Sequence, residues 1–463
     1  MIKQLGKINL KSIILVLLAF IFSYFAQINL ALTLFLVILS GYLKLRGLDI
    51  KCCRLLNLFL LFLVIYAGAY FIIRQKLSIF YIPFSIVPML ATLLFNSLEV
   101  SLLITLASAV AVASFSGLPL QTTLLALTSG AVSSFLVLGA RKRSTIIRAG
   151  IFNAILQILV LILLEHLWVG LPSRYLTLFL NGIISSIIVL GVLPVFEYLF
   201  NTATNISLLE LADFHHPLLQ RMVQEAPGTY HHSLIVGNLS ETACRAVGAN
   251  ALLARIGAYY HDIGKLQKPE YFSENQSREV NKHGNLSPTM SKLVIMNHVK
   301  EGLELARRYR LNPALVDFIQ QHHGKSLVYY FYRRALENIE EDEVIREEGF
   351  RYPGPKPSSK ETAIVLLADS VEAAMRTLRE PSPAKIEELV HKVINNKFID
   401  GQLDECELAL KDLEKISAVF IRLLCGIYHS RASYPEGARI ENNHKKSSKE
   451  NSRLSGKDKE NNP

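Results

Sequence analysis

The chain has 463 residues, of which 51% are hydrophobic and only 19% are charged. This length would suit about three soluble domains, but ordinary soluble domains are about 25% charged. The first 200 residues contain 14 Lys and Arg and four acidic residues, whereas the remainder carries 35 of each. The net charge of +10 therefore lies in the apolar half, where it is typical of the basic loops that orient membrane helices. It does not indicate a nucleic-acid-binding protein.

The apolar half contains enough sequence for eight membrane-spanning helices, because a bilayer core about 30 Å thick needs roughly 20 apolar residues per helix. We predict a transmembrane domain over residues 1–200, with spans near 9–26, 29–43, 55–73, 78–95, 97–115, 119–139, 150–170 and 176–198. Only Gln27 and Asn29 separate the first two spans, so seven spans are the alternative. Eight spans place the N-terminus and most basic loops in the cytoplasm, and both counts put the polar C-terminal part there. Charge within the spans is scarce, which favours an anchor or sensor over a transporter.

The rest of the chain is predicted to be all-α, because its apolar residues recur at helical spacing without a run of alternating β-branched residues. A connector helix over residues 201–228 leads out of the membrane and ends at Ala226-Pro227-Gly228. The domain that follows, 229–437, is expected to contain helices near 229–247, 250–262, 288–308, 312–322, 360–379, 383–398 and 407–428. We expect a surface excursion over 338–360 and a disordered polar tail over 438–463.

Histidines that accompany acidic residues are the informative feature of the second half. The set comprises His232, His261, Asp262, His298, His322, His323 and Asp369. A single histidine on a helix is usually a surface or core residue, but so many within one domain indicate a metal site. Imidazoles and carboxylates are ligands for iron, manganese and zinc, and the absence of cysteine from the set disfavours a structural zinc site.

Asp262 occupies the pivotal position in this set. A carboxylate directly after a histidine at a helix end can present its two oxygens to two metals. Two metals about 3.5–4 Å apart can share a water, lower its pKa and neutralise charge on an attacked phosphate. Lys265 lies one helical turn from Asp262 and can reach a phosphate oxygen at the same site. Asp262 and Lys265 are therefore the candidate catalytic residues of a hydrolase that uses a two-metal-activated hydroxide.

Five motifs in the sequence resemble a known family. They are EAPGTYHHS (225–233), GAYYHDIGK (257–265), YFYRRALE (330–337), FRYPGPKP (350–357) and GIYHS (426–430). Over about residues 80–435 the chain resembles the membrane-anchored seven-transmembrane HD family of the HD metallophosphohydrolase superfamily. The resemblance implies an all-helical HD phosphohydrolase domain, anchored in a bacterial cell membrane, that hydrolyses cyclic-di-AMP to linear pApA.

The resemblance also implies how the metal ligands divide. One divalent cation would bind His232, His261, Asp262 and Asp369, and the other would bind Asp262, His298, His322 and His323; family members resemble manganese or iron enzymes. Two departures stand out. The family usually carries a large extracytoplasmic domain after its first membrane helix, and none is expected at the polar break between residues 27 and 29. The family also often has His at the position of Arg333 and Pro-His-Asp at Lys282-His283-Gly284.

The candidates for substrate contact are Lys265, His283, Tyr332, Arg333 and Arg376. For His283 a structural role is an equal alternative, and a solvent-facing arginine is the commoner outcome at Arg376. An aromatic run such as Tyr329 to Tyr332 is more often core than an adenine platform. His215, His216 and His231 are interpreted as structural.

Other functions remain alternatives on the sequence alone. A cyclic-di-GMP hydrolase of the HD-GYP type needs a Gly-Tyr-Pro signature after its paired histidines, and Lys325-Ser326-Leu327 does not supply it. An alarmone hydrolase has acidic residues where Gly264-Lys265 stand here. A phosphohydrolase of another nucleotide and a non-catalytic nucleotide receptor stay open, as does homodimer formation. Cyclic-di-AMP and membrane lipid are the expected partners.

Overall fold

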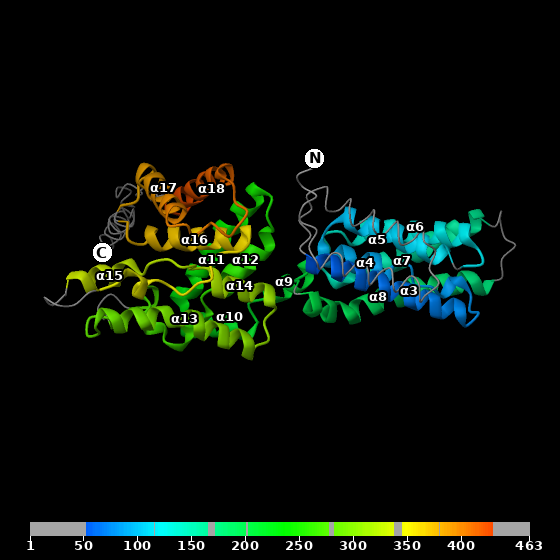
Figure 1. Ribbon diagram of the computed structural model, residues 1–463, viewed down its shortest axis with the longest axis horizontal. Coiled ribbons are helices and arrows are strands. Elements are labelled where there is room, and N and C mark those ends of the chain that lie inside the picture. Colours follow the sequence, from blue (N-terminus) through cyan, green and yellow to red (C-terminus); the bar gives the residue numbers. More distant parts are fainter. Residues whose placement is uncertain are drawn as a thin grey trace, which may run out of the picture.

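The computed structural model describes residues 52–114, 116–164, 172–200, 202–276, 282–337, 345–378 and 380–428. Two helical bodies lie end to end, a membrane lobe (residues 52–200) and a C-terminal lobe (residues 202–428), and helix α9 lies at their junction (Figure 1). The ranges described contain no strand beyond a single bridge between Leu327 and Arg351. The prediction of an all-α membrane domain followed by an all-helical domain is therefore confirmed.

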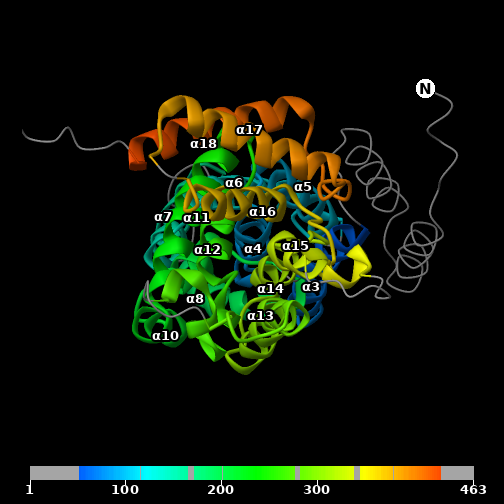
Figure 2. The ribbon, with the colours of Figure 1, turned by 90° about the vertical axis from the view of Figure 1, so that its left-hand side faces the viewer.

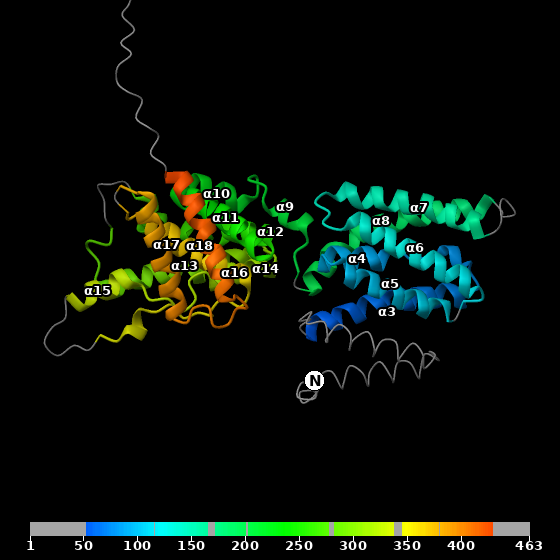
Figure 3. The ribbon, with the colours of Figure 1, turned by 90° about the horizontal axis from the view of Figure 1, so that it is seen from above.

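The membrane lobe consists of long apolar helices that lie side by side along its length (Figure 3). They are α3 (Cys52–Arg74), α4 (Ile86–Phe95), α5 (Leu98–Ala113), α6 (Pro119–Val137), α7 (Arg143–Leu164) and α8 (Pro172–Phe200). Three of them, α6, α7 and α8, are long and apolar enough to cross a bilayer, and shorter apolar helical stretches include Leu60–Arg74 and Leu98–Ala113. The predicted spans near 9–26 and 29–43 lie outside the described residues.

The predicted span near 78–95 is interrupted in the structure, although Ile79–Phe95 as a whole is a short apolar helical stretch. A 3₁₀ turn, η2 (Ile79–Tyr81), precedes a break, and α4 starts only at Ile86. Pro83 lies in the break, where it lacks an N–H and disfavours helical geometry in the residue before it. The Asn181 side chain of α8 donates hydrogen bonds to the backbone carbonyls of Phe80 and Ile82 at 2.9 and 3.0 Å. These bonds satisfy backbone groups that the break releases inside an apolar environment.

The connector forms two helices instead of the single helix predicted over residues 201–228. They are α9 (Asn205–Leu211) and α10 (Pro217–Glu225), and Pro217 begins the second because proline suits the first turn of a helix. Arg143 at the start of α7 forms a two-pronged ion pair with Glu210 of α9, with N–O distances of 2.7 and 3.0 Å. The ring of His216 packs against Tyr260 in an edge-to-face arrangement, in keeping with the structural role expected for this histidine.

The C-terminal lobe surrounds one buried helix, α16. Its elements are α11 (Pro227–Val247), α12 (Ala251–Tyr260), η3 (Ile263–Gln267), η4 (Pro269–Tyr271), η5 (Ser273–Asn275), α13 (Pro288–Arg308), α14 (Pro313–Gln321), α15 (Tyr329–Glu337), η6 (Glu347–Phe350), α16 (Lys360–Met375), α17 (Pro383–Ile399) and α18 (Leu410–Tyr428). Figure 2 shows α16 between the pair α17 and α18 and the remaining helices. Most of its residues are buried, and it contacts α11, α12, α14 and α17.

Part of the predicted surface excursion belongs to the interior. Phe350 and Tyr352 are only 5% and 7% exposed. Phe350 packs with Phe331 and Ala335 of α15, and residues 338–344 lie outside the described residues. The acidic and proline-rich composition of this stretch predicted an exposed loop, but its two aromatic residues Phe350 and Tyr352 are buried.

Candidate metal centre

All seven predicted ligand residues meet at one point of the C-terminal lobe. Five helices supply them: His232 comes from α11, His261 and Asp262 from the end of α12, His298 from α13, His322 and His323 from the end of α14, and Asp369 from α16. Six of the seven are buried, and His323 is partly exposed with 23% of its side chain accessible. Residues far apart in the sequence therefore form one enclosed polar cluster.

Local backbone geometry brings the His-Asp pair against α13. Helix α12 ends at Tyr260, and the chain continues through Asp262 into the 3₁₀ turn η3. A Cβ atom at Gly264 would lie only 1.8 Å from the backbone oxygen of His298. Glycine at this position thus allows η3 to approach α13 closely enough for His298 to face Asp262.

The Asp262 carboxylate lies between two groups of imidazoles. Its Oδ2 is 3.2 Å from Nε2 of His261 and 3.6 Å from Nε2 of His232. Its Oδ1 is 3.3 Å from Nε2 of His298 and 3.5 Å from Nε2 of His322. Each oxygen thus faces a different group, which is the arrangement that a bridging carboxylate requires.

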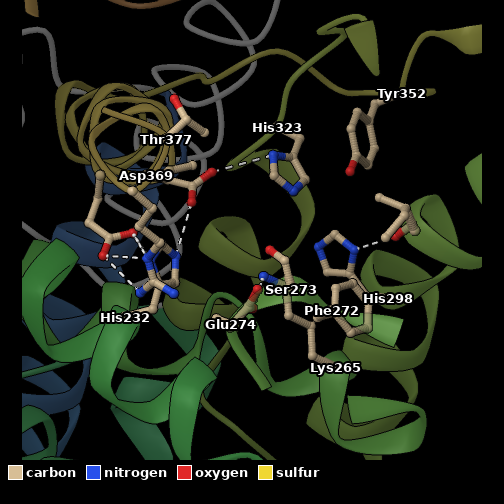
Figure 4. A pocket seen from close by; sticks show the side chains of 14 residues that line it. His232, Lys265, Phe272, Ser273, Glu274, His298, His323, Tyr352, Asp369 and Thr377 are labelled. Carbon is tan, nitrogen blue, oxygen red and sulfur yellow. Dashed lines mark hydrogen bonds and ion pairs between the residues drawn. The ribbon is translucent and has the colours of Figure 1, made fainter. Parts of the chain in front are cut away.

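Asp369 and His323 complete the cluster. Oδ1 of Asp369 lies 3.1 Å from Nε2 of His232 and 3.8 Å from Nε2 of His261. Its Oδ2 lies 3.5 Å from Nδ1 of His323 (Figure 4). The His323 ring stacks on Tyr352 with a centroid separation of 4.3 Å.

Hydrogen bonds at Nδ1 orient four of the imidazoles. The Nδ1 atoms of His261 and His298 lie 2.6 Å from the carbonyl oxygens of Ala258 and Ile295, and Nδ1 of His322 lies 3.0 Å from those of Phe318 and Ile319. Nδ1 of His232 instead lies 2.5 Å from a carboxylate oxygen of Glu372. If Nδ1 carries the proton in each ring, Nε2 presents its lone pair to the centre, as metal-binding histidines generally do.

The unsatisfied polar atoms of the cluster fit divalent cations. Nε2 of His261 and Oδ1 of Asp262 are buried without a hydrogen-bond partner, an unfavourable state unless a ligand satisfies them. One ligand atom from each member of two groups, His232–His261–Asp262–Asp369 and Asp262–His298–His322–His323, lies within 4.8 Å of the others in its group. The donor set suits divalent metals, and Asp262 belongs to both groups.

The electrostatics of the cluster favour positive charge. Burial raises the pKa of Asp262, but His261 and Lys265 outweigh it and hold this pKa well below its usual range. Burial lowers the pKa of His261, yet Asp262 and Asp369 raise it overall to about 10. In contrast, burial lowers the pKa of His298 to about 4. A proton on His261 or a bound cation can thus balance the negative charge of Asp262 and Asp369.

A cavity of about 480 Å³ opens beside the cluster (Figure 4). Its walls include four of the predicted ligands, His232, His298, His323 and Asp369. Lys265 also lines it, with Nζ 2.7 Å from Oδ2 of Asp262 and 2.8 Å from Oε1 of Glu274. The predicted catalytic lysine therefore lies at the centre and is held by two carboxylates.

Only two of the five substrate-contact candidates, Lys265 and Arg376, line the cavity. Arg376, for which a solvent-facing position was the commoner expectation, hydrogen-bonds Glu372 at 2.8 Å and is only 32% exposed. The other three lie elsewhere among the described residues. His283 packs between Tyr271 and Phe331, Tyr332 packs against Phe350, and Arg333 is exposed near Glu337.

Sequence reasoning missed several cavity residues, among them Glu372, Glu274 and Tyr352. Glu372 lies one helical turn after Asp369, so helical spacing alone could have placed it on the same face. Glu274 lies in the short 3₁₀ turn η5 and Tyr352 in an irregular segment, and no local periodicity connects them to the cluster. Their position depends on the path of the chain between helices.

The fold and the ligand set define a class of protein, an HD-type metal-binding domain behind a helical membrane domain. Family models agree: residues 18–204 match "7TM receptor with intracellular HD hydrolase", and residues 229–374 match "HD domain". The chain belongs to the seven-transmembrane HD family.

Relatives with assigned names are similar over much of the chain. It is 46% identical over 315 residues to "Cyclic-di-AMP phosphodiesterase PgpH" of Bacillus subtilis, which covers 66% of this chain and 44% of that protein. It is 36% identical over 395 residues to the protein of the same name from Listeria monocytogenes, which covers 82% and 53%. The chain therefore spans about half the length of these curated relatives.

Crystal structures exist for the HD domain of the L. monocytogenes protein, one of them in complex with cyclic-di-AMP. Both are 44% identical to this chain, with a TM-score of 0.44. They cover 46% and 47% of this chain and 100% of the crystallised chain.

Proposed function

We propose that this chain is a membrane-anchored phosphodiesterase that hydrolyses cyclic-di-AMP to linear pApA. The observation that carries the proposal is the position of Asp262, whose two oxygens face two separate groups of imidazoles beside an open cavity. The names of the B. subtilis and L. monocytogenes relatives support the choice of substrate.

Two divalent cations are the proposed cofactors. His232, His261, Asp262 and Asp369 would hold one, and Asp262, His298, His322 and His323 would hold the other. The His and Asp donors are compatible with manganese or iron, which we propose as the native metals. When bound, such cations supply Lewis-acid chemistry, because they lower the pKa of water and neutralise charge on a phosphate.

The cationic side chains of the cavity would bind the phosphates of the substrate. Lys265 and Arg376 both line the wall, and ammonium and guanidinium groups are common phosphate ligands in proteins. The volume of about 480 Å³ lies in the usual range of small-molecule sites, roughly 300–1,000 Å³. We therefore propose that these two side chains orient a phosphodiester toward Asp262.

Tyr352 is the proposed hydrogen-bond donor to the leaving group. Its phenol points into the cavity, and its ring is stacked on His323 (Figure 4). Hydrolysis adds water to phosphorus and breaks the bond to the 3′ oxygen of a ribose, which must then take up a proton. Burial raises the pKa of Tyr352 above its ordinary value, so the phenol stays protonated at neutral pH and can donate.

We further propose that the N-terminus and the C-terminal lobe lie in the cytoplasm of a bacterial cell, with the membrane lobe in contact with lipid. The basic residues of the first 200 positions support this orientation. Homodimer formation stays a prediction, which light scattering of the detergent-solubilised protein would measure.

The test uses the full chain in detergent, loaded with Mn²⁺ and incubated with cyclic-di-AMP while the products are separated by chromatography. We expect pApA to accumulate, and Asp262→Ala to reduce turnover to background because both cation groups lose their shared ligand. Tight binding of cyclic-di-AMP without turnover would contradict the enzymatic function and support a receptor. Turnover of other cyclic dinucleotides in preference to cyclic-di-AMP would contradict the proposed substrate.

A further inference from the structure

Of the four imidazoles with a hydrogen bond at Nδ1, that of His232 is held differently from the others. The Nδ1 atoms of His261, His298 and His322 are bonded to backbone carbonyls of their own helices. Nδ1 of His232 is bonded to the Glu372 side chain, which is 1% exposed and comes from another helix, α16. The orientation of His232 therefore depends on a side chain, whereas that of the other three depends on helical backbone.

The carboxylate of Glu372 is itself fixed by Arg376. Nε of Arg376 lies 2.8 and 3.0 Å from the two carboxylate oxygens, and Nη2 lies 2.8 Å from Oε1. A buried carboxylate is costly unless it is paired in this way. Asp369 and Glu372 lie on one face of α16, and Arg376, its C-cap, continues that face. A candidate metal ligand, the support of a second ligand and a cation of the cavity wall therefore follow one another along α16.

We infer that Glu372 is a positioning residue for one of the two cations only. It contacts His232, which belongs to the group with His261, Asp262 and Asp369 and not to the group with His298, His322 and His323. A carboxylate behind a metal-binding histidine fixes its tautomer and raises its basicity, and loss of such a partner typically costs 10- to 100-fold in metal affinity. The inference rests on the proposed two-cation site but not on the identity of the substrate.

The same contacts give Arg376 two roles. It holds Glu372 in place, and it forms part of the wall that a substrate phosphate would approach. Arg376 therefore links Glu372, the hydrogen-bond partner of His232, to the wall of the cavity that would bind phosphate. In this arrangement Glu372 acts through His232, and we do not expect it to touch the reacting atoms.

The experiment is a Mn²⁺ titration of the full chain in detergent, followed by calorimetry and electron paramagnetic resonance. We expect wild type to bind two Mn²⁺ as a spin-coupled pair. Glu372→Gln keeps the shape of the side chain and removes its charge, so affinity for one Mn²⁺ should fall about 10- to 100-fold while the other is retained. The spectrum at limiting metal should then show isolated Mn²⁺.

Glu361→Gln is the matched control, because Glu361 lies on the same helix and bonds the backbone N–H of Asn250 instead of a ligand. It should bind both cations as wild type does. Two unchanged affinities in Glu372→Gln would overturn the inference, and so would an equal loss of both cations. Failure of wild type to hydrolyse cyclic-di-AMP would contradict the proposed function alone, because the titration does not involve the substrate.

Discussion

At the scale of single residues, the site contains two carboxylates and two cationic side chains, and within each pair the two residues have different roles. Asp262 and Asp369 are both buried and acidic, but only Asp262 also faces His298 and His322; Asp369 reaches the second group only at His323. Lys265 and Arg376 are both cations of the cavity wall, but only Lys265 contacts Asp262. Residue type was enough to identify these side chains as candidates for the site, but their different roles depend on where each lies within the cluster.

Tyr352→Phe tests the proposed donor at this scale. The substitution keeps the ring that stacks on His323 and removes only the hydroxyl, so Mn²⁺ content should be unchanged. Turnover of cyclic-di-AMP should fall by about 100-fold, the usual effect of removing one donor that acts in the transition state. Steady-state kinetics with metal analysis would measure both quantities.

A substrate with a better leaving group supplies the control for Tyr352→Phe. 4-Nitrophenolate leaves without a proton, so hydrolysis of bis(4-nitrophenyl) phosphate should be nearly insensitive to the substitution. An equal loss with both substrates would show that the phenol does not assist the leaving group.

At the scale of helices and turns, the candidate ligands lie together because the backbones of neighbouring elements approach each other closely. The turn η3 lies against α13 at Gly264, and without that contact His298 could not lie 3.3 Å from Asp262. The C-terminal ends of α12 and α14 are each followed by a pair of candidate ligands, His261–Asp262 and His322–His323, so both helix ends point at the same site. Helix boundaries are therefore part of the site.

Gly264→Ala should destabilise the C-terminal lobe and weaken Mn²⁺ binding together, because the added methyl meets the backbone of His298. Overpacking of this kind costs about 1–3 kcal/mol. Gly426→Ala is the control: its Cβ would meet nothing within 4 Å, and alanine is the better helix former by up to about 1 kcal/mol. Thermal unfolding with and without Mn²⁺ would show whether the unfolding temperature falls for Gly264→Ala and rises for Gly426→Ala, as this packing predicts.

The segment that carries Tyr352 is joined to the end of α17 by a titratable pair. Arg351 donates to both carboxylate oxygens of Asp400 at 2.8 and 3.1 Å. Burial raises the pKa of Asp400, but the bonds from Arg351 and Gln402 outweigh it, so the folded-state pKa lies below the ordinary value. The stabilising contribution is therefore present above the unfolded-state pKa, near 3.9, and is lost as the pH falls through the folded-state pKa.

Comparison of wild type with Asp400→Asn across pH 3.5 to 7 checks this sign. The partly exposed pair should contribute about 1 kcal/mol or less at pH 7, and the difference in unfolding free energy should shrink toward the acid end. A difference that grows on acidification would contradict the assignment.

At the scale of the whole molecule, the cations would hold five helices of one lobe together while the membrane lobe stays independent of them. The ligands come from α11, α12, α13, α14 and α16. The lobes meet at other contacts, including the Arg143–Glu210 ion pair. Metal removal should therefore act on the C-terminal lobe.

Chelation with EDTA tests this division. A ligand present at 1,000 times its dissociation constant stabilises the folded state by about 4 kcal/mol, so removal should lower the unfolding temperature of the C-terminal lobe by roughly 8–16 °C. Scanning calorimetry of the full chain should show that one transition moves. The Asp262→Ala variant should not respond to EDTA, and a response equal to that of wild type would contradict the ligand set.

The candidate ligand residues, the all-helical class and most helix positions of the C-terminal lobe could be predicted from the amino-acid sequence. The predicted segment 288–308 coincides with α13, and all seven predicted ligands meet in the structure. These features are local, because ligand chemistry resides in residue type and helical periodicity resides in spacing. Such information does not depend on how the chain packs.

Which other side chains line the cavity, and where the helices break, became clear from the packing of the folded chain. Glu274 and Tyr352 reach the same wall as Asp369 from segments that no periodicity connects to α16. The break before α4 is bridged by Asn181, about a hundred residues later in the chain. Contacts of this kind depend on packing between distant elements, and a single sequence does not specify which distant residues will meet.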